Sequence, residues 1–269
     1  MNKILLIGCG HMGGALLDSW LKTKKYNLTV VDPKKYNLLK KKYKNEKIIL
    51  IKSISDLEKR LKFKFVILAM KPLDFSTALD ELYKYELNKN ATIISVVAGK
   101  KIKTIQSKLT NNKNIFRVMP NMPASISKSM NCIVKGKLVS KSKINEVNQL
   151  FSHSGKTIFL NNEDEIDMAT AISGSGPGFV FYMIHAFEKA AIKLGFKKKS
   201  AKTLVLQTFK GSIDLILENN IPAYKLVKTV ATKGGTTEAG LKVMNEKKIN
   251  KAFIDLTRAA YKKAKQQGK

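Results

Sequence analysis

The chain has 269 residues, enough for one large or two modest domains that bury a core without disulfide support. Hydrophobic residues make up 44% of it, with 16 Gly and 6 Pro, which excludes collagen-like and disordered classes. The formal net charge of +30 would suit a nucleic-acid or acidic-surface partner. Almost all of the basic residues are lysine, whereas arginine is the usual residue for bidentate recognition of phosphates and bases. We therefore interpret the charge as solvated surface and expect no specific nucleic-acid partner.

The cysteine and apolar patterns favour a cytoplasmic location. Cys9 and Cys132 are far apart, as expected in a reducing compartment, and neither they nor the three histidines have metal-ligand spacing. The apolar run before Cys9 is too short for the hydrophobic region of a signal peptide. No run approaches the roughly 20 apolar residues of a membrane span, so no membrane partner is expected. Because the cysteines and histidines lack metal-ligand spacing, no bound metal is expected either.

The first half of the chain alternates short apolar runs with amphipathic segments. The runs are rich in Ile, Val and Leu, as expected for strands that are buried on both faces of a parallel sheet. The predicted strands are Ile4–Ile7, Leu28–Val31, Phe65–Ala69, Thr92–Val97, Ile115–Val118, Asn131–Val134 and Thr157–Leu160. The predicted helices between the first strands are Gly13–Lys22, Tyr36–Lys44, Asp56–Leu61 and Ser76–Tyr83. This alternation predicts βαβ units in a doubly wound α/β sheet.

After about Asn162 the pattern becomes almost entirely helical. The predicted helices are Asp164–Ile172, Pro177–Leu194, Ser200–Glu218, Ala223–Thr229, Thr236–Asn245 and Asn250–Gln266. The sequence thus predicts a Rossmann-type dinucleotide-binding domain over residues 1–162 and an all-helical domain over residues 163–269.

A glycine-rich motif follows the first predicted strand and opens the first predicted helix. The run Gly8-Cys9-Gly10-His11-Met12-Gly13 fits G-x-G-x-x-G, in which the glycines permit a tight turn, a close pyrophosphate and helix packing. Asp32 ends the second predicted strand about 20 residues later, where a carboxylate meets the ribose hydroxyls of a dinucleotide. Asp32 favours NAD because its carboxylate repels a 2′-phosphate. Lys34 and Lys35 could pair with that phosphate, so NADP remains an alternative.

Three further segments lie at the ends of predicted strands, where open α/β sheets bind ligands. They are Ala69-Met70-Lys71-Pro72, Val96-Val97-Ala98-Gly99 and Met119-Pro120-Asn121-Met122-Pro123. Each alone is consistent with an ordinary loop, and for Pro72 and Gly99 an ordinary loop is the favoured interpretation. Together with the glycine motif, they are expected to line one cleft.

Two small-residue turns are predicted to lead into helices in the second half. They are Ser173-Gly174-Ser175-Gly176-Pro177 and Thr232-Lys233-Gly234-Gly235-Thr236-Thr237. Free backbone N–H groups and the positive end of the helix dipole favour carboxylate binding at such turns. Helix capping by Ser175 and Thr236 is the structural alternative.

In the order and spacing of its motifs, the chain resembles the pyrroline-5-carboxylate reductase family over essentially its full length. The resemblance rests on Ile7–Gly13, Ala69–Pro72, Arg117–Pro123, Ser173–Pro177 and Gly234–Thr237. It implies a Rossmann domain followed by a helical dimerisation domain, and a homodimer that often assembles further, commonly to a decamer. The implied reaction is hydride transfer from NADPH or NADH to the imine carbon of 1-pyrroline-5-carboxylate, which gives L-proline in the final step of proline biosynthesis.

Pattern and resemblance together define the candidate site. The candidate cofactor-binding residues are Ile7, Gly8, Cys9, Gly10, His11, Met12, Gly13, Asp32, Ala69, Met70, Lys71, Pro72, Val96, Val97, Ala98 and Asn121. The candidate substrate-binding residues are Ser175, Gly235, Thr236 and Thr237. The resemblance implies that the Gly235–Thr237 turn holds the substrate carboxylate, for which the N–H groups of Gly235 and Thr237 are the expected donors. It also implies that the Thr237 hydroxyl lies near the imine nitrogen, as the candidate catalytic group.

Two alternatives stay open on sequence alone. Another Rossmann-plus-helix reductase, such as a 3-hydroxy acid dehydrogenase, would place a catalytic lysine on a helix of the second half, where Lys189 and Lys193 lie without a supporting motif. The second alternative is a catalytically inactive relative that senses nucleotides or binds nucleic acid. Only the net charge and Lys233 favour it.

Overall fold

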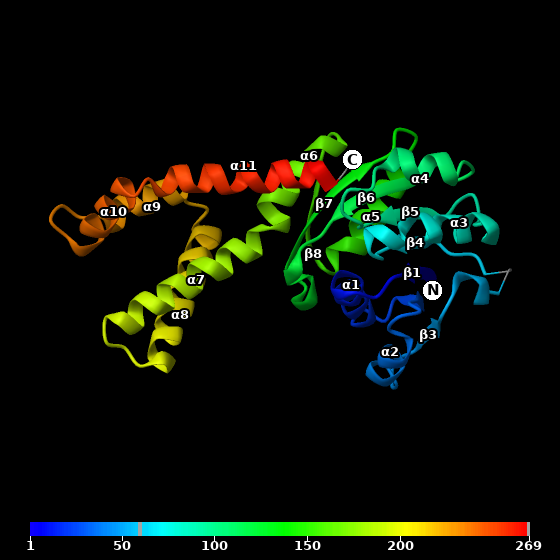
Figure 1. Ribbon diagram of the computed structural model, residues 1–269, viewed down its shortest axis with the longest axis horizontal. Helices are drawn as coiled ribbons and strands as arrows, with labels where there is room; N and C mark the ends of the chain where they lie inside the picture. Colours follow the sequence, from blue (N-terminus) through cyan, green and yellow to red (C-terminus); the bar gives the residue numbers. More distant parts are fainter. Residues whose placement is uncertain (59–60, 268–269) are drawn as a thin grey trace. The chain divides into compact units, whose positions relative to one another are not determined.

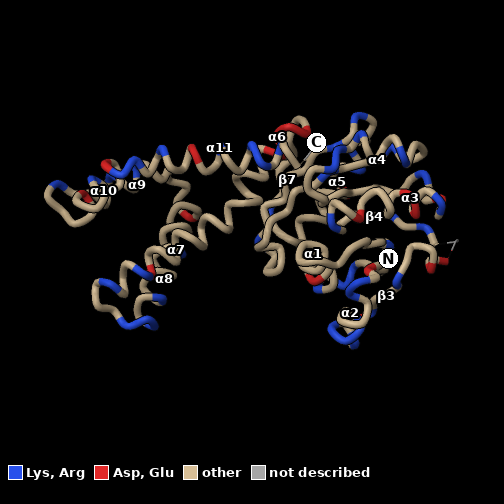
Figure 2. Tube along the Cα trace, viewed as in Figure 1, with Lys and Arg blue, Asp and Glu red and all other residues tan. Residues whose placement is uncertain are grey.

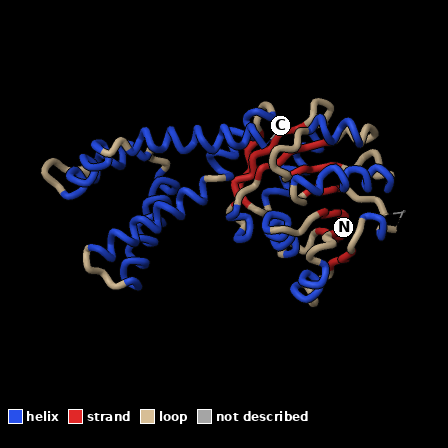
Figure 3. Tube along the Cα trace, viewed as in Figure 1, coloured by secondary structure: helices blue, strands red, loops and turns tan. Residues whose placement is uncertain are grey.

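The computed structural model describes residues 1–58 and 61–267, which form two compact units (Figure 1). The first contains Met1–Ser175 together with the chain from Ala260 onward, and the second contains Gly176–Ala259. The described strands all belong to the first unit, whereas the second unit is helical (Figure 3). The predicted class, a Rossmann-type sheet followed by a helical region, is confirmed.

The first unit is built on one eight-stranded sheet with the order β3-β2-β1-β4-β5-β6-β7-β8. Strands β1 to β6 are parallel, β7 is antiparallel to β6, and β8 is parallel to β7. The order reverses at β1, so the crevice at the carboxyl ends of the strands opens beside this strand. The strands are β1 (Asn2–Ile7), β2 (Tyr26–Val31), β3 (Ile48–Ile51), β4 (Phe65–Leu68), β5 (Thr92–Ser95), β6 (Ile115–Met119), β7 (Ser129–Lys135) and β8 (Gly155–Phe159).

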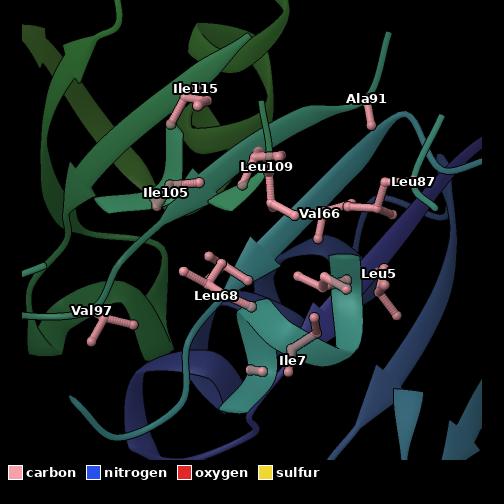
Figure 4. Packing of buried hydrophobic residues seen from close by; sticks show 14 of the residues in the cluster. Leu5, Ile7, Val66, Leu68, Leu87, Ala91, Val97, Ile105, Leu109 and Ile115 are labelled. Atoms are coloured by element: carbon pink, nitrogen blue, oxygen red, sulfur yellow. The ribbon is translucent and has the colours of Figure 1, made fainter. Parts of the chain in front are cut away.

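Helices cover both faces of this sheet. The helices of the first unit before the helical region are α1 (His11–Leu21), α2 (Tyr36–Lys42), α3 (Phe75–Tyr85), α4 (Ile102–Lys108), α5 (Lys141–Ser152) and α6 (Glu163–Ala169). Because side chains alternate along a strand, β1 directs Ile4 and Leu6 into a core with α1, α2 and α5. It directs Leu5 and Ile7 into a second core with α3, α4 and α6, part of which Figure 4 shows. Burial on both faces explains the continuous apolar runs.

A buried ion pair joins α6 to the sheet. The Nη1 atom of Arg117, on β6, lies 3.2 Å from Oε1 of Glu163, and its Nη2 atom lies 3.8 Å from Oδ1 of Asp167. The Arg117 side chain is only 6% exposed. Glu163 also accepts the backbone N–H of Ile102 at the start of α4. A single guanidinium therefore pairs with two carboxylates of α6, a geometry that lysine does not reproduce, and Glu163 extends this network to α4.

The remaining helices lie wholly or largely in the second unit. They are α7 (Gly176–Lys193), α8 (Lys198–Asn219), α9 (Ala223–Val230), α10 (Thr236–Glu246) and α11 (Ile249–Gln267), whose end belongs to the first unit. No residue of helices α7, α9 and α10 is fully buried. Large apolar side chains are exposed on α7, such as Tyr182, and on α8, such as Leu217. These helices leave apolar surface that the chain itself does not cover.

Some local predictions were wrong. The helix predicted over 56–61 is replaced by a short 3₁₀ turn, Ile54–Asp56, which Ser53 caps; residues 59–60 lie outside the described residues. Strand β3 and helices α4 and α5 were not predicted.

Candidate active site

The glycine loop connects β1 to α1 with the geometry that the motif predicts. Gly8 has a φ of +89°, and a Cβ there would lie 2.5 Å from the backbone N of Met70. A Cβ on Gly13 would collide with the carbonyl oxygen of Gly8. A Cβ on Gly10, by contrast, would meet no protein atom within 4 Å. The fold therefore requires the first and third glycines, whereas no protein atom near Gly10 requires the second, which leaves space there for a ligand.

Helix α1 begins at His11, directly after Gly10, and no side chain caps its described N-terminus. The first backbone N–H groups of a helix have no partner inside it, and the helix dipole is positive at this end. His11 is exposed and Met12 is partly buried. The loop can therefore hold a pyrophosphate through backbone donors alone, so a dinucleotide fits it.

Asp32 follows the last residue of β2 and makes contacts that sequence reasoning did not predict. Its Oδ2 atom accepts the backbone N–H of Cys9 at 2.8 Å, and its Oδ1 atom accepts the N–H of Lys35 at 2.9 Å. The carboxylate is buried, while Lys34 is exposed and pairs with Asp74. Asp32 thus fixes the glycine loop in addition to standing where a ribose would be recognised.

Burial controls the chemistry of the glycine-loop thiol. Cys9 is 3% exposed, and burial together with the negative charge of Asp32 raises the pKa of its thiol to about 11. Cys9 is therefore a thiol at neutral pH, and its backbone N–H, rather than its sulfur, serves the loop.

The predicted strand-end segments lie at the same edge as the glycine loop. The N–H of Ala69 bonds to the carbonyl of Ile7, and the N–H of Val96 bonds to the carbonyl of Leu68. Met70 lies against Gly8. Val97 is buried, Ala98 is partly buried, and Lys71 and Pro72 are exposed in the loop after β4. The structure thus brings the ends of β1, β4 and β5 together with the glycine loop.

Asn121 also lies at this edge, just after β6, but its amide is engaged within the protein. Its Nδ2 atom donates to the carbonyl of Ser173 at 2.9 Å, and its Oδ1 atom accepts the N–H of Met130 at 2.9 Å. Asn121 is buried.

The small-residue segment predicted at Ser173–Pro177 leads into a helix, α7, as expected, but it includes the end of a π-helical turn instead of forming an open loop. Residues Thr170–Gly174 form a π-helical turn that continues into α7, and the N–H of Ser175 donates to the carbonyl of Thr170 at 2.8 Å. Ser175 has a helical φ of −83° and ψ of −24°, so it is not an N-cap. Its backbone N–H is therefore occupied, and only its side chain is available to a ligand.

The second predicted turn is present and preformed. The N–H of Gly235 donates to the carbonyl of Thr232 at 3.0 Å, and Gly234 has a φ of +75°, as in a type II turn with Lys233 at its second position. The N–H of Gly234 donates to Oε2 of Glu238 at 2.7 Å. Because its N–H is occupied within the turn, Gly235 is not the free carboxylate donor that we expected.

Helix α10 begins with the two threonines of this motif. Gly235 is the N-cap, and Thr236 is the first helical residue, so the predicted capping by Thr236 is wrong. The N–H groups of Thr236 and Thr237 belong to the first helical turn, which leaves them without intrahelical partners. Both side chains are exposed. The loop therefore presents backbone donors and the Thr237 hydroxyl at the positive end of a helix.

In residues 1–58 and 61–267, no three His, Cys, Asp or Glu side chains are grouped so as to hold a metal ion. No helix in this described part is both long and apolar enough to cross a membrane.

The fold and the glycine loop define a Rossmann-type dinucleotide-binding protein. In agreement, residues 3–99 match the profile of the family "NADP oxidoreductase coenzyme F420-dependent", and residues 163–267 match "Pyrroline-5-carboxylate reductase dimerisation". The chain belongs to the pyrroline-5-carboxylate reductase family, because it is 33% identical to pyrroline-5-carboxylate reductase 2 of Bacillus subtilis, with 94% of this chain and 91% of the relative covered.

Two further comparisons cover the whole chain. Pyrroline-5-carboxylate reductase of Methanosarcina acetivorans is 30% identical over 100% of this chain and 98% of its own length. The crystal structure of Plasmodium falciparum pyrroline carboxylate reductase with NADP bound superposes with a TM-score of 0.86 and 27% identity, covering 100% of this chain and 98% of that one. The resemblance recognised in the sequence is thereby confirmed.

Proposed function

We propose that this protein is an NAD(P)H-dependent pyrroline-5-carboxylate reductase that acts in the cytoplasm and makes L-proline from 1-pyrroline-5-carboxylate. The observation that carries the proposal is the full-length match to reductases of this name, over both the Rossmann unit and the helical region. The glycine loop, with a required glycine on either side of an accessible Gly10, supports the same function.

The first unit supplies the cofactor site. The bound nicotinamide cofactor supplies the hydride. Residues Ile7–Gly13 present backbone donors to its phosphates, and Asp32 faces the adenosine ribose. Ala69–Pro72 and Val96–Ala98 form the adjoining strand ends, which position the reactive ring and exclude water.

The turn before α10 supplies the substrate site. The N–H groups of Thr236 and Thr237, at the positive end of α10, bind the substrate carboxylate. The occupied N–H groups of Gly234 and Gly235 hold the turn in shape for this task. The Thr237 hydroxyl hydrogen-bonds the imine nitrogen and relays to it a proton taken up from solvent, which restores the hydroxyl, and the Ser175 side chain adds a polar contact.

The active form is a homodimer, with a decamer as the complete assembly. Apolar side chains that α7 and α8 leave exposed support dimerisation, since Tyr182 is 74% and Leu217 is 64% exposed in the single chain. Burying such side chains is the main driving force of protein association. On this proposal residues 1–162 bind the cofactor, and residues 163–269 bind the substrate and form the dimer.

The distribution of the basic residues over the chain does not favour a specific nucleic-acid site. Figure 2 shows Lys and Arg on elements of both units, with acidic residues among them. A specific nucleic-acid site would need a concentrated basic face.

A substrate panel tests the proposed function. Oxidation of NADH and NADPH is followed with 1-pyrroline-5-carboxylate, and reduction of NAD and NADP is followed with 3-hydroxy acids. Turnover of the cyclic imine alone supports the proposal, whereas turnover of a 3-hydroxy acid alone identifies the other class of reductase.

A further inference from the structure

The π-helical turn at Thr170–Gly174 has a cause in the sequence. In an α-helix the carbonyl of Ser173 would accept the N–H of the residue four positions later, which is Pro177. Proline has no N–H, and its ring crowds the carbonyl four residues earlier. The helix between α6 and α7 is accordingly interrupted here, and the Ser173 carbonyl needs another donor.

Asn121 supplies this donor. Its Nδ2 atom lies 2.9 Å from the Ser173 carbonyl oxygen, while its Oδ1 atom accepts the N–H of Met130 at 2.9 Å. One partner is an obligatory acceptor and the other an obligatory donor, so the orientation of the amide is fixed. The backbone N–H of Asn121 adds a third bond, to Oγ of Ser129. A buried group with all of these partners has one conformation.

Other contacts hold the π-helical turn at the same place. A Cβ on Gly174 would lie 3.0 Å from the Cε atom of Met119, the last residue of β6. Oγ of Ser173 lies 3.6 Å from Sγ of Cys132 on β7. Just after Asn121, the 3₁₀ turn Met122–Ile126 packs against α1, the helix that the glycine loop opens. Asn121 therefore stands between the π-helical turn and the edge of the sheet that carries the nucleotide site.

We propose that Asn121 is a positioning residue for the reduction: its amide replaces the N–H that Pro177 removes and so fixes the Ser173–Ser175 segment at the carboxyl edge of the sheet. The inference rests on the proposed function, and it assigns Asn121 no direct contact with the cofactor. Misplacing the segment should slow the chemical step more than it weakens cofactor binding, because small errors of position reduce rate steeply.

Asn121→Asp tests the hydrogen bond with little change of shape. An ionised Asp still accepts the Met130 N–H but faces the Ser173 carbonyl with a second acceptor, whereas a protonated Asp donates to it again. We expect kcat to fall about tenfold or more at about pH 8 and to recover, relative to wild type, as the pH is lowered. The affinity for NAD(P)H, measured by fluorescence, should change less than about threefold.

Two variants separate this effect from loss of stability. Asn121→Ala removes the donor at every pH, so its kcat should be low without recovery in acid. Asn131→Asp is the matched control, because Asn131 on β7 donates to the carbonyls of Phe151 and Lys156 and none of its described hydrogen bonds reaches the π-helical turn. Its folded fraction should keep the wild-type dependence of kcat on pH.

Other ionisable groups on the packed elements are present in every variant. They include Cys132 on β7, Arg117 on β6, Glu163 and Asp167 on α6, and His11 and Asp18 on α1. Dividing each profile by that of the wild-type enzyme removes their contribution.

The outcomes are distinct. Recovery in acid for Asn121→Asp alone, with cofactor affinity retained, supports the proposal. A pH-independent loss of kcat, or a loss of cofactor affinity as large as the loss of kcat, overturns it. If the wild type does not reduce the imine, the proposed function fails separately, and amide hydrogen exchange at Ser175 then decides the structural part. Exchange should accelerate in Asn121→Asp at about pH 8 and return toward the wild-type rate in acid. Unchanged exchange would contradict the role of Asn121.

Discussion

The carboxylate of Asp32 accepts the backbone N–H of Cys9 at 2.8 Å, which ties the end of β2 to the glycine loop. One side chain thus holds the loop and, on the proposed function, also lies where cofactors with and without a 2′-phosphate would be distinguished. The two roles have separable consequences.

Replacing Asp32 should change both cofactor affinity and cofactor preference. We expect the wild type to use NADH at least as well as NADPH. In Asp32→Ser the kcat/KM ratio should shift toward NADPH by about tenfold, or about 1.4 kcal/mol, because repulsion of the phosphate is removed. KM for both cofactors should rise, since Cys9 loses its acceptor. A wild type at least about tenfold better with NADPH would show that Lys34 or Lys35 governs the pocket instead.

The glycines of the loop should respond differently to alanine. Gly10→Ala meets no protein atom, so its free energy of unfolding should stay within about 0.5 kcal/mol of wild type while NAD(P)H affinity falls about tenfold or more. Gly13→Ala is the matched comparison, and it should lose several kcal/mol because its Cβ collides with the Gly8 carbonyl. Urea unfolding and fluorescence titration give the two quantities. Normal cofactor binding by Gly10→Ala would contradict the proposal that this loop binds the cofactor.

Thr237 should matter for the chemical step. Thr237→Val keeps the shape of the first turn of α10 but loses the hydroxyl, so kcat and kcat/KM should fall together by about 100-fold with cofactor affinity unchanged. Thr236→Val should cost much less, because the Thr236 side chain makes no capping bond in the described structure. A near-wild-type kcat for Thr237→Val would mean that the proton comes from another source.

Arg117 should be a main determinant of stability in the first unit. In Arg117→Met the carboxylates of Glu163 and Asp167 lose their buried cation, so the free energy of unfolding should fall by about 3–5 kcal/mol. Glu163→Gln keeps an acceptor for the Ile102 N–H and should cost less. Urea unfolding measures the free energy of unfolding of both variants. An equal loss in the two would contradict this role of Arg117.

Both cysteines should resist modification in the folded protein. Burial together with the negative charge of Asp32 raises the pKa of the Cys9 thiol to about 11. Burial also raises the pKa of the Cys132 thiol. At about pH 8 the thiolate fraction of Cys9 should be about 100-fold below that of an ordinary thiol, and alkylation slower in proportion. Iodoacetamide labelling with and without denaturant measures this. Rapid labelling of the native protein would show that the glycine loop opens.

The sequence predicts most of the fold because its strands are buried on both faces and its glycine motif has a backbone requirement at Gly8 and Gly13. Helix α5 has its buried residues Val147, Leu150 and Phe151 at helical spacing, so its pattern was available in the sequence but was not used. Strand β3 is a short strand at the edge of the sheet. Bonds between distant residues, such as Asp32 to Cys9 and Asn121 to Ser173, leave no periodic signal. Pro177 four residues after Ser173 did signal an unpaired carbonyl, but the sequence does not say which residue pairs with it.

The most direct test of the proposed function is steady-state reduction of synthetic 1-pyrroline-5-carboxylate by the purified wild-type protein, with the product identified chemically. We expect oxidation of NADH or NADPH in equal amount to the L-proline formed, without added metal. Absence of turnover with both cofactors, while NAD(P)H still binds the glycine loop, would contradict the assignment of this chain as a pyrroline-5-carboxylate reductase.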